Sequence, residues 1–386
     1  MEKKSGYETT MKSDADSKII YINSLKILLT VLVVLHHAFI TYVASGSWYY
    51  TERTLLNPAL VIMNMFTITN MTFFMGLFFF LSSFFIEPSI QKKGFKKYLT
   101  ERLKRLGIPL IFYSIVLSPT LNYIAEHYGK GEHNSFYEYM SGYRHWIDFG
   151  VLWFVAALLI FSILFAVLKT KFPTISEGRF SYPGDISILI FAVFLGFITY
   201  LVRGYFPIGW TLKPFGFQLS DFPQYILLFI LGIIAFNNNW LDEINYRKSK
   251  QWFYLALIFI VVVLPLLSAI KFQTKSPDET IRGHFTWQSL LFAEWQQITG
   301  ISLIVGLLGI ARQRWNWTGK LRTKLARNSY GVYIFHPLIL ICLALLVKRI
   351  PIEPIFKLLF IAPIAVICSF AFINLLLKIT VVNKII

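Results

Sequence analysis

Charged residues are scarce in this chain of 386 residues, and cysteine is almost absent. Only 15% of the residues are charged, whereas 56% are hydrophobic and 17% aromatic, and the mean hydropathy is +0.58. This composition excludes a soluble globular domain and predicts a polytopic membrane protein. The two cysteines, Cys342 and Cys368, fall inside apolar runs, so neither a disulfide nor thiolate chemistry is expected.

Signatures of common soluble enzymes are absent as well. The sequence has no Gly-rich phosphate loop, no Gly-x-Ser-x-Gly nucleophile elbow, no His-Glu-x-x-His motif and no Cys/His cluster with metal-ligand spacing. No metal and no permanently bound cofactor are therefore expected. Internal repeats and low-complexity tracts are also missing. The sequence predicts a short N-terminal leader, residues 1–20, followed by one membrane domain, residues 21–386.

Long apolar runs are the dominant pattern of the chain. Stretches of about 18 residues or more predict an all-α, polytopic helical bundle with about ten transmembrane helices. One of these runs is shorter than the rest, at 222–236. The predicted spans are 27–44, 65–86, 108–126, 148–168, 184–202, 222–236, 252–270, 288–310, 330–347 and 358–377.

Basic residues outnumber acidic ones, with 37 Lys and Arg against 20 Asp and Glu and a net charge of +17. Of the 37 basic residues, 26 lie at the chain ends and in alternate loops, on one side of the predicted spans. The positive-inside rule makes this side of the cell membrane, with both termini, cytoplasmic. The charge is dispersed beside spans without a nucleic-acid fold pattern. The expected partner is therefore the lipid bilayer and not nucleic acid.

Lys26 and His37 are separated by ten residues in the first apolar run. Eleven helical steps of about 100° return to nearly the same azimuth, and at about 1.5 Å each they climb about 16 Å. In a bilayer with a hydrocarbon core of about 30 Å, Lys26 lies at one boundary and His37 near the middle. A titratable side chain there is a candidate functional residue. Its neighbour His36 points about 100° away, so we expect it to contact another helix and not the same pocket.

A cationic segment follows the second span. Seven Lys and Arg residues lie within residues 91–105, more than topology alone requires. Arg102 and Arg105 are three residues apart, so on a helix they project together and can hold a phosphate as planar, bidentate donors. The alternative interpretation is a juxtamembrane patch that binds anionic lipid.

A second intramembrane histidine, His336, is predicted in the ninth span. It lies nine residues beyond Arg327, about 13 Å deep if the segment is helical. Pro337 follows it and frees a backbone carbonyl one turn back, which needs another partner. A single histidine of this kind is more often an interhelical hydrogen bonder than a catalyst, but two at similar depth favour a functional role.

Glu294 is an acidic residue in the eighth span, and two glutamines follow it closely. An isolated carboxylate in hydrocarbon is neutralised or paired, and His37 and His336 are the obvious intramembrane partners. The alternative is that Glu294 lies near the outer end of its span and faces water.

The order of these motifs resembles acyltransferase family 3, a family of polytopic membrane acyltransferases that includes glucan- and O-antigen-modifying enzymes. In that family a basic residue, ten residues and a His mark the first span, as do Lys26 and His37 here. A cytoplasmic Arg-x-x-Arg follows the second span, as do Arg102 and Arg105. Further similar segments are Phe78 to Phe84, Leu152-Trp153-Phe154 and Tyr330 to His336.

The resemblance extends from about residue 20 to 375, with three departures. Lys26 replaces the commoner Arg, Asn23 occupies the usual Asp position, and Ser83 replaces Gly. Lysine at position 26 keeps the charge but loses the bidentate phosphate geometry of arginine. The periplasmic esterase-like domain that is fused to some members is not expected here.

The resemblance implies transfer of an acyl group, expected to be acetyl, from cytoplasmic acyl-CoA. The acceptor is a hydroxyl on a glycan or on another molecule reached from the outer side. In this interpretation Arg102, Arg105 and Lys26 bind the anionic end of acyl-CoA. His37, with an ordinary pKa near 6.5, acts as the general base toward the acceptor hydroxyl.

His336 or Glu294 would then orient the base or stabilise charge. A proton-coupled transporter is the alternative function, because intramembrane His and Glu also serve as proton relays. That alternative predicts inverted repeats and broken-helix pairs, which the sequence does not display. A scaffold without chemistry explains the polar residues within the spans least well.

Overall fold

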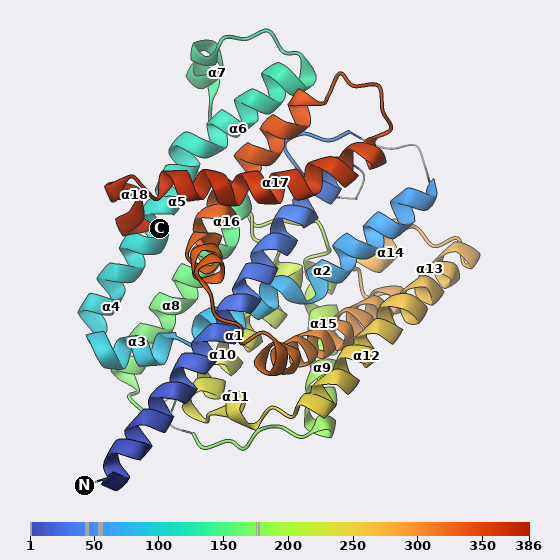
Figure 1. Ribbon diagram of the computed structural model, residues 1–386. Helices are drawn as coiled ribbons and strands as arrows, with labels where there is room; N and C mark the ends of the chain where they lie inside the picture. The colour runs from blue at the N-terminus through green and yellow to red at the C-terminus, as the bar shows by residue number, and fades with distance from the viewer. Residues whose placement is uncertain (1, 43–45, 53–56, 175, 177) are drawn as a thin grey trace.

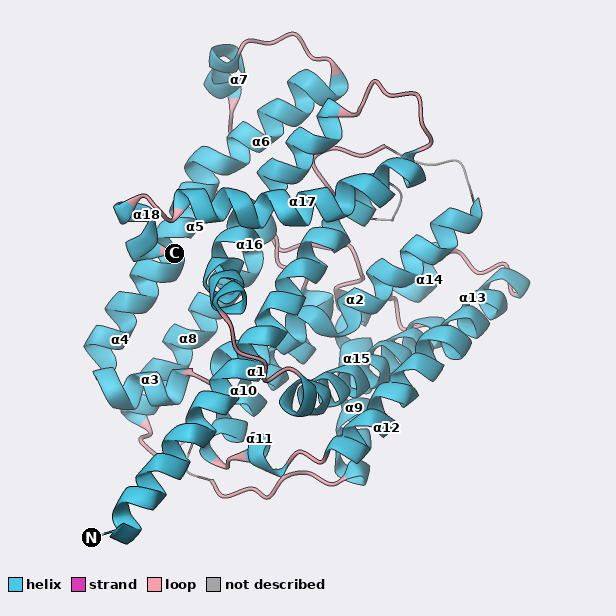
Figure 2. Cartoon of the chain, in the orientation of Figure 1, coloured by secondary structure: helices cyan, strands magenta, loops and turns pink. Residues whose placement is uncertain are grey.

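The fold consists of long apolar helices. The computed structural model describes residues 2–42, 46–52, 57–174, 176 and 178–386, with the side chains of residues 2–19 and of Asn57 outside the description. Ten of its helices are long and apolar enough to cross a membrane, and no strand occurs among the described residues (Figure 2). The predicted all-α fold and its ten spans are confirmed.

The first six spans are formed by helices that Figure 1 labels in chain order. They are α1 (Glu2–Tyr42), α2 (Asn57–Ser83) with α3 (Ile86–Lys93), the run α4 (Phe95–Arg102), α5 (Ile108–Phe112) and α6 (Ser118–Ile124), α8 (Trp153–Lys171), α9 (Asp185–Tyr205), and α10 (Phe222–Asn237).

The last four spans and the short helices complete the chain. The spans are α12 (Tyr246–Ile258) with α13 (Leu264–Gln273), α15 (Trp287–Arg314), α16 (Lys320–Leu346) and α17 (Pro354–Leu376). The short helices are α7 (Phe136–Gly142), α11 (Trp240–Glu243), α14 (Asp278–Arg282) and α18 (Thr380–Ile385).

Ten crossings define two sides of the bundle. The start of the first span and the end of the tenth lie on one side, which we call the terminal side; α3, α4, α11 and α18 belong to it. The opposite side, which we call the far side, holds the loops after the odd-numbered spans, with α7 and α14.

The third span is not a regular α-helix. It contains π-helical turns at Leu103–Gly107, Tyr113–Leu117 and Ala125–Lys130. Such turns insert an extra residue into the helical ladder and frequently occur at functional sites. The first turn includes Arg105 and the second begins at Tyr113.

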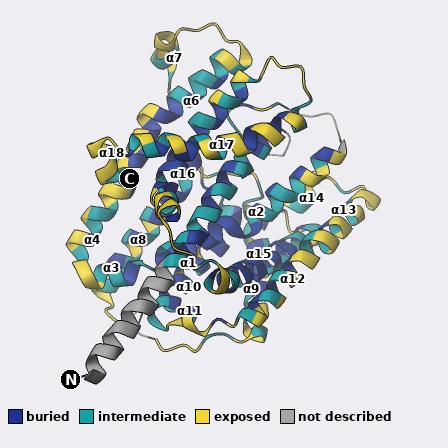
Figure 3. Ribbon diagram, in the orientation of Figure 1, coloured by how far each residue is buried: buried dark blue, intermediate teal, exposed yellow. Residues whose placement is uncertain are grey.

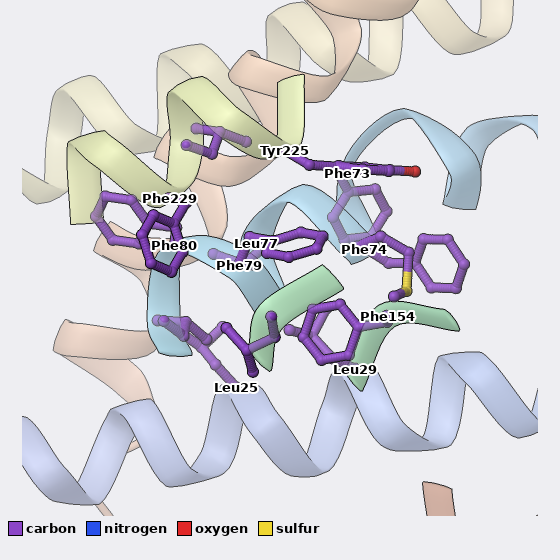
Figure 4. Packing of buried hydrophobic residues seen from close by; sticks show 14 of the residues in the cluster. Leu25, Leu29, Phe73, Phe74, Leu77, Phe79, Phe80, Phe154, Tyr225 and Phe229 are labelled. Atoms are coloured by element: carbon purple, nitrogen blue, oxygen red, sulfur yellow. The ribbon is translucent and has the colours of Figure 1, made fainter. Parts of the chain in front are cut away.

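Helix α1 occupies the centre of the bundle and packs against α2, α15, α16 and α17 (Figure 1). Buried residues gather in the interior, whereas exposed ones lie on peripheral helices and loops (Figure 3). Figure 4 shows part of this core, where aromatic rings from α2, α8 and α10 meet leucines of α1. The ring centroids of Phe79 and Phe154 are 4.6 Å apart, and those of Phe79 and Tyr225 are 5.1 Å apart. These ring contacts fix the relative positions of three spans.

A glycine allows α15 and α2 to approach closely. A Cβ atom built on Gly300 would lie 2.0 Å from the carbonyl oxygen of Thr72. That oxygen also accepts a hydrogen bond of 2.7 Å from Nε2 of Gln224 in α10. Small residues at helix contacts are the usual means of close packing in membranes, because lipid provides no hydrophobic drive between helices. Gly300 therefore holds three spans together through backbone contact.

We predict that Gly300→Ala lowers the stability of the bundle. The methyl group would overlap the Thr72 carbonyl, and overpacking of this kind costs about 1–3 kcal/mol. Thermal unfolding of the purified protein in detergent measures the effect. Gly107→Ala is the matched control, because nothing lies within 4 Å of a Cβ at that helical position. Equal midpoints for the two variants would contradict the prediction.

Candidate active site

The two intramembrane histidines meet in the structure. His37 comes from α1 and His336 from α16, and Nδ1 of His37 lies 3.0 Å from Nε2 of His336. Their ring centroids are 5.0 Å apart. His336 is completely buried, whereas His37 is half-buried. The sequence predicts the depth of each histidine separately, and the fold joins them directly.

Pro337 determines which nitrogen of His336 carries its proton. Proline has no backbone N–H, so the carbonyl of Tyr333, four residues earlier, has no helical donor. Nδ1 of His336 lies 2.9 Å from that oxygen and must donate to it, because a carbonyl oxygen can only accept. In a neutral ring, Nε2 of His336 is then an acceptor toward His37.

The same reasoning assigns the proton on His37. Its Nδ1 lies 3.0 Å from the carbonyl oxygen of Val33 and 3.0 Å from the acceptor nitrogen of His336, so Nδ1 carries the hydrogen. Nε2 of a neutral His37 is then unprotonated. It has no hydrogen-bond partner among the residues that the structure describes. This assignment follows from the hydrogen-bond network and makes Nε2 a free base.

A tryptophan covers the His37 ring. The rings of Trp48 and His37 are stacked with centroids 4.2 Å apart and an angle of 23° between their planes. Trp48 lies in the described loop segment 46–52 on the far side. The sequence interpretation missed it, because an aromatic residue just beyond a span resembles an interfacial belt residue.

Glu52 anchors the end of this loop. Its backbone N–H donates to the carbonyl of Thr41 at 2.7 Å, and its carboxylate accepts from Nζ of Lys357 in α17 at 2.6 Å. The hydroxyl of Tyr50 donates to the other carboxylate oxygen at 2.8 Å. Lys357 is buried, so the pair is shielded from water and holds the Trp48 loop against α17.

A cavity of about 1130 Å³ opens beside His37. It is lined by loop residues that follow spans one, three, five and seven, so it belongs to the far side. Its aromatic lining includes Trp48, Trp153 and Tyr225, and its acidic lining includes Asp148 and Asp221. Aromatic faces combined with carboxylates suit a hydroxyl-rich ligand better than a purely apolar one.

His36 corrects one expectation. It also lines this cavity, although the 100° offset from His37 predicted that it would face elsewhere. The ring of His36 packs against Phe74 with centroids 5.2 Å apart. The cavity is wide enough to contact two neighbouring positions around α1. The 100° angle between His36 and His37 therefore does not place them in different surroundings.

Two tyrosines form a polar contact at the cavity wall. The hydroxyls of Tyr49, in the far-side loop, and Tyr113 are 2.9 Å apart. The pKa of the Tyr49 hydroxyl is raised well above its ordinary value. Burial is the largest cause, and the neighbouring Tyr113 is the second. Tyr49 therefore stays neutral at physiological pH and can donate or accept a hydrogen bond.

A buried ion pair stands behind the cavity. Nη2 of Arg203 in α9 donates to Asp221 at 2.9 Å and to Oε1 of Gln296 at 2.5 Å. Gln296 in turn donates to Asp221 at 3.2 Å. Arg203 and Asp221 are not among the residues predicted from the sequence, although charges at the ends of apolar runs were the available signal. Together with Gln296, the pair connects α9, the turn that precedes α10, and α15.

Glu294 does not join the histidines. Its carboxylate packs against Gly196 of α9, and Oε2 is buried without a hydrogen-bond partner among the described residues. It is also not among the residues that line the cavity. The predicted pairing with His37 and His336 is therefore wrong, because α15 turns this side chain toward α9.

The three predicted cationic residues lie near one another on the terminal side. Lys26 is half-buried, lies 4.7 Å from the centroid of the Phe85 ring, and is within electrostatic range of Arg102 and Arg105. The hydroxyl of Tyr330 in α16 donates to the Arg105 carbonyl at 3.0 Å. The cluster and the cavity thus lie on opposite sides of His37.

Comparison with known protein families shows the family to which the chain belongs. A family model described as an acyltransferase domain, Acyl_transf_3, matches residues 19–374. The chain belongs to this acyltransferase family. No curated protein and no solved structure matches it. The family and the ten spans together make this acyltransferase a multi-pass membrane protein.

We predict that diethyl pyrocarbonate modifies His37 of this acyltransferase and spares His336. The reagent attacks unprotonated imidazole nitrogens, and Nε2 of His37 is free, whereas both nitrogens of the fully buried His336 are engaged. Tandem mass spectrometry of peptides locates the adducts. Exposed His133 gives the rate for a free imidazole, and modification of His336 as fast as His37 would overturn the tautomer assignment.

Proposed function

We propose that this protein is an integral membrane O-acyltransferase that moves an acyl group, acetyl in the simplest case, from acyl-CoA to a hydroxyl of a glycan or similar acceptor. The observation that carries the proposal is the position of the His37–His336 pair between a cationic cluster and a cavity. A cationic cluster lies on the terminal side, and a large polar and aromatic cavity lies on the far side.

His37 is the general base of the proposed reaction. Its Nε2 takes the proton from the acceptor hydroxyl while the hydroxyl oxygen attacks the thioester carbonyl carbon. The carbon–sulfur bond then breaks, and the proton passes from His37 to the departing CoA sulfur. His336 is a positioning residue, because its Nε2 accepts from His37 Nδ1 and stabilises the imidazolium that forms.

The donor enters from the terminal side. Arg102, Arg105 and Lys26 bind the phosphates of CoA, and the narrow pantetheine arm reaches along α1 toward His37. Eleven helical steps of about 1.5 Å separate Lys26 from His37, so the arm crosses about half of the hydrocarbon core. The excess of Lys and Arg on this side supports a cytoplasmic location for both termini in the cell membrane.

The acceptor enters from the far side. Sugar rings stack on faces such as those of Trp153 and Trp287, and carboxylates such as Asp148 accept hydrogen bonds from hydroxyls. This lining supports a hydroxyl-rich acceptor of the glycan class.

The first test of the proposal is the His37→Ala variant. Loss of a positioned general base lowers turnover roughly 100-fold or more, while acyl-CoA binding stays nearly unchanged. Transfer of labelled acyl groups to an envelope extract by matched amounts of folded protein measures the loss.

His36→Phe is the matched control for this test, because it keeps a ring against Phe74. We expect it to lose less than roughly tenfold in turnover, well below the loss for a general base. Near-normal transfer by His37→Ala would move the base to His336. A proton-coupled transporter would instead give pH-dependent flux without acyl transfer in either protein.

The second test concerns the donor phosphates. Arg102→Ala or Arg105→Ala raises the Kd for acyl-CoA roughly 10- to 100-fold, since a hydrogen bond to a charged group contributes about 1.5–3 kcal/mol. Lysine at either position rescues only part of the loss. Isothermal titration with acetyl-CoA measures the change, and exposed Lys97 in α4 provides the control Lys97→Ala.

Sealed vesicles that contain the protein in either orientation test the side from which the donor enters. Added acyl-CoA supports transfer only where the terminal side faces the medium. Unchanged donor affinity in both arginine variants would favour a lipid-binding patch over a donor site.

A further inference from the structure

A second hollow of about 500 Å³ lies on the terminal side, between the first turns of α16 and the last turn of α17. It shares no lining residue with the histidine cavity. Its lining is dominated by four cations: Lys320, Lys324 and Arg327 of α16, and Lys378 just beyond α17. The mechanism proposed above does not use any of these side chains.

The positive charge at this hollow is concentrated by helix geometry. Positions 320, 324 and 327 are four and three residues apart, so their side chains lie on one face of α16. Like charges at this spacing repel each other. None of the lining side chains is a carboxylate, and the hydrogen-bond partner of Arg327 is the neutral amide oxygen of Asn383. The arrangement therefore lacks a negative group at its centre.

The chemistry of the lining favours a phosphate group. Arg327 offers a planar donor fork, the lysines offer mobile point charges, and the amides of Asn328 and Asn374 add neutral donors. Phosphate oxygens accept several such bonds at once, and charge-assisted bonds of this type are the strong ones.

The position of the hollow favours a lipid as the source of that phosphate. The span Lys320–Leu346 begins here, and the span Pro354–Leu376 ends here. The ends of spans lie at the level where lipid headgroups meet the helices. Buried Leu377 forms part of the wall, so apolar surface adjoins the cations as acyl chains adjoin a headgroup. Basic pockets between spans on the cytoplasmic side are a known means of headgroup recognition.

We propose that this hollow binds the phosphate of an anionic membrane phospholipid, and we call it the α16–α17 headgroup site. It is independent of the proposed acyl transfer, because it involves neither the histidine pair nor the cationic residues Lys26, Arg102 and Arg105. A bound headgroup neutralises the repelling cations and ties the start of α16 to the end of α17. The expected result is a bundle that is more stable with anionic lipid than with zwitterionic lipid.

The experiment uses the full chain in detergent, titrated with phosphatidylglycerol or phosphatidylcholine. Native mass spectrometry counts retained lipids, and thermal unfolding reports stabilisation. The triple variant Lys320→Gln, Lys324→Gln, Arg327→Gln weakens phosphatidylglycerol binding on the order of 100-fold, because each cation near an anionic headgroup contributes a factor of about five. Lys378→Gln, just beyond α17, gives a smaller loss in the same direction and serves if the triple variant does not fold.

The matched control is the triple variant Lys92→Gln, Lys96→Gln, Lys97→Gln. It removes the same charge from exposed positions on the same side but outside the hollow, and it keeps the affinity for phosphatidylglycerol. Equal losses in the two triple variants would mean a diffuse surface effect and overturn the site. Equal binding of both lipids by the wild type would overturn it as well.

Two further arms identify the source of the phosphate. Inorganic phosphate at millimolar concentration should not displace phosphatidylglycerol, and displacement would assign the hollow to free phosphate. Acetyl-CoA affinity should be unchanged in the α16 triple variant, and its loss with normal lipid binding would assign the hollow to the donor.

Discussion

The hydrogen bond between His37 and His336 organises the interior of this protein. Inside a bilayer, a polar side chain without a partner is costly, so two imidazoles near mid-membrane pair with each other and join their helices. The bond joins the first and ninth spans across a long stretch of sequence. It also leaves one nitrogen of His37 unpaired on the side of the cavity. A packing contact and a chemical site are therefore the same interaction.

The parts of the fold that the sequence predicts are those that depend on local pattern. Apolar runs locate the ten helices, because the backbone N–H and C=O groups of a span must form hydrogen bonds within the same segment. Helical rise gives the depth of His37 and His336 independently, and both depths place them within reach of each other. The spacing of Arg102 and Arg105 predicts that the two project together, and in the structure both lie within electrostatic range of Lys26.

The parts that the sequence does not predict depend on how each helix is rotated and on which neighbour it meets. Glu294 was expected near the histidines, but the rotation of α15 turns it to Gly196. Trp48 lies in a loop, where no period constrains its direction, yet it stacks on His37. Arg203 has its partner on another helix, a pairing that charge alone does not reveal.

Pro337 illustrates how a residue can act through a group that it lacks. Any other amino acid at this position would offer its N–H to the Tyr333 carbonyl and compete with the His336 ring. The ring could then turn over and present a donor to His37, whose own free nitrogen would no longer be defined. The basicity of the cavity thus depends on the main chain of α16, at a position that does not line the cavity. Replacement of Pro337 would change the proton positions on His336 and His37 even if the fold of α16 stayed the same.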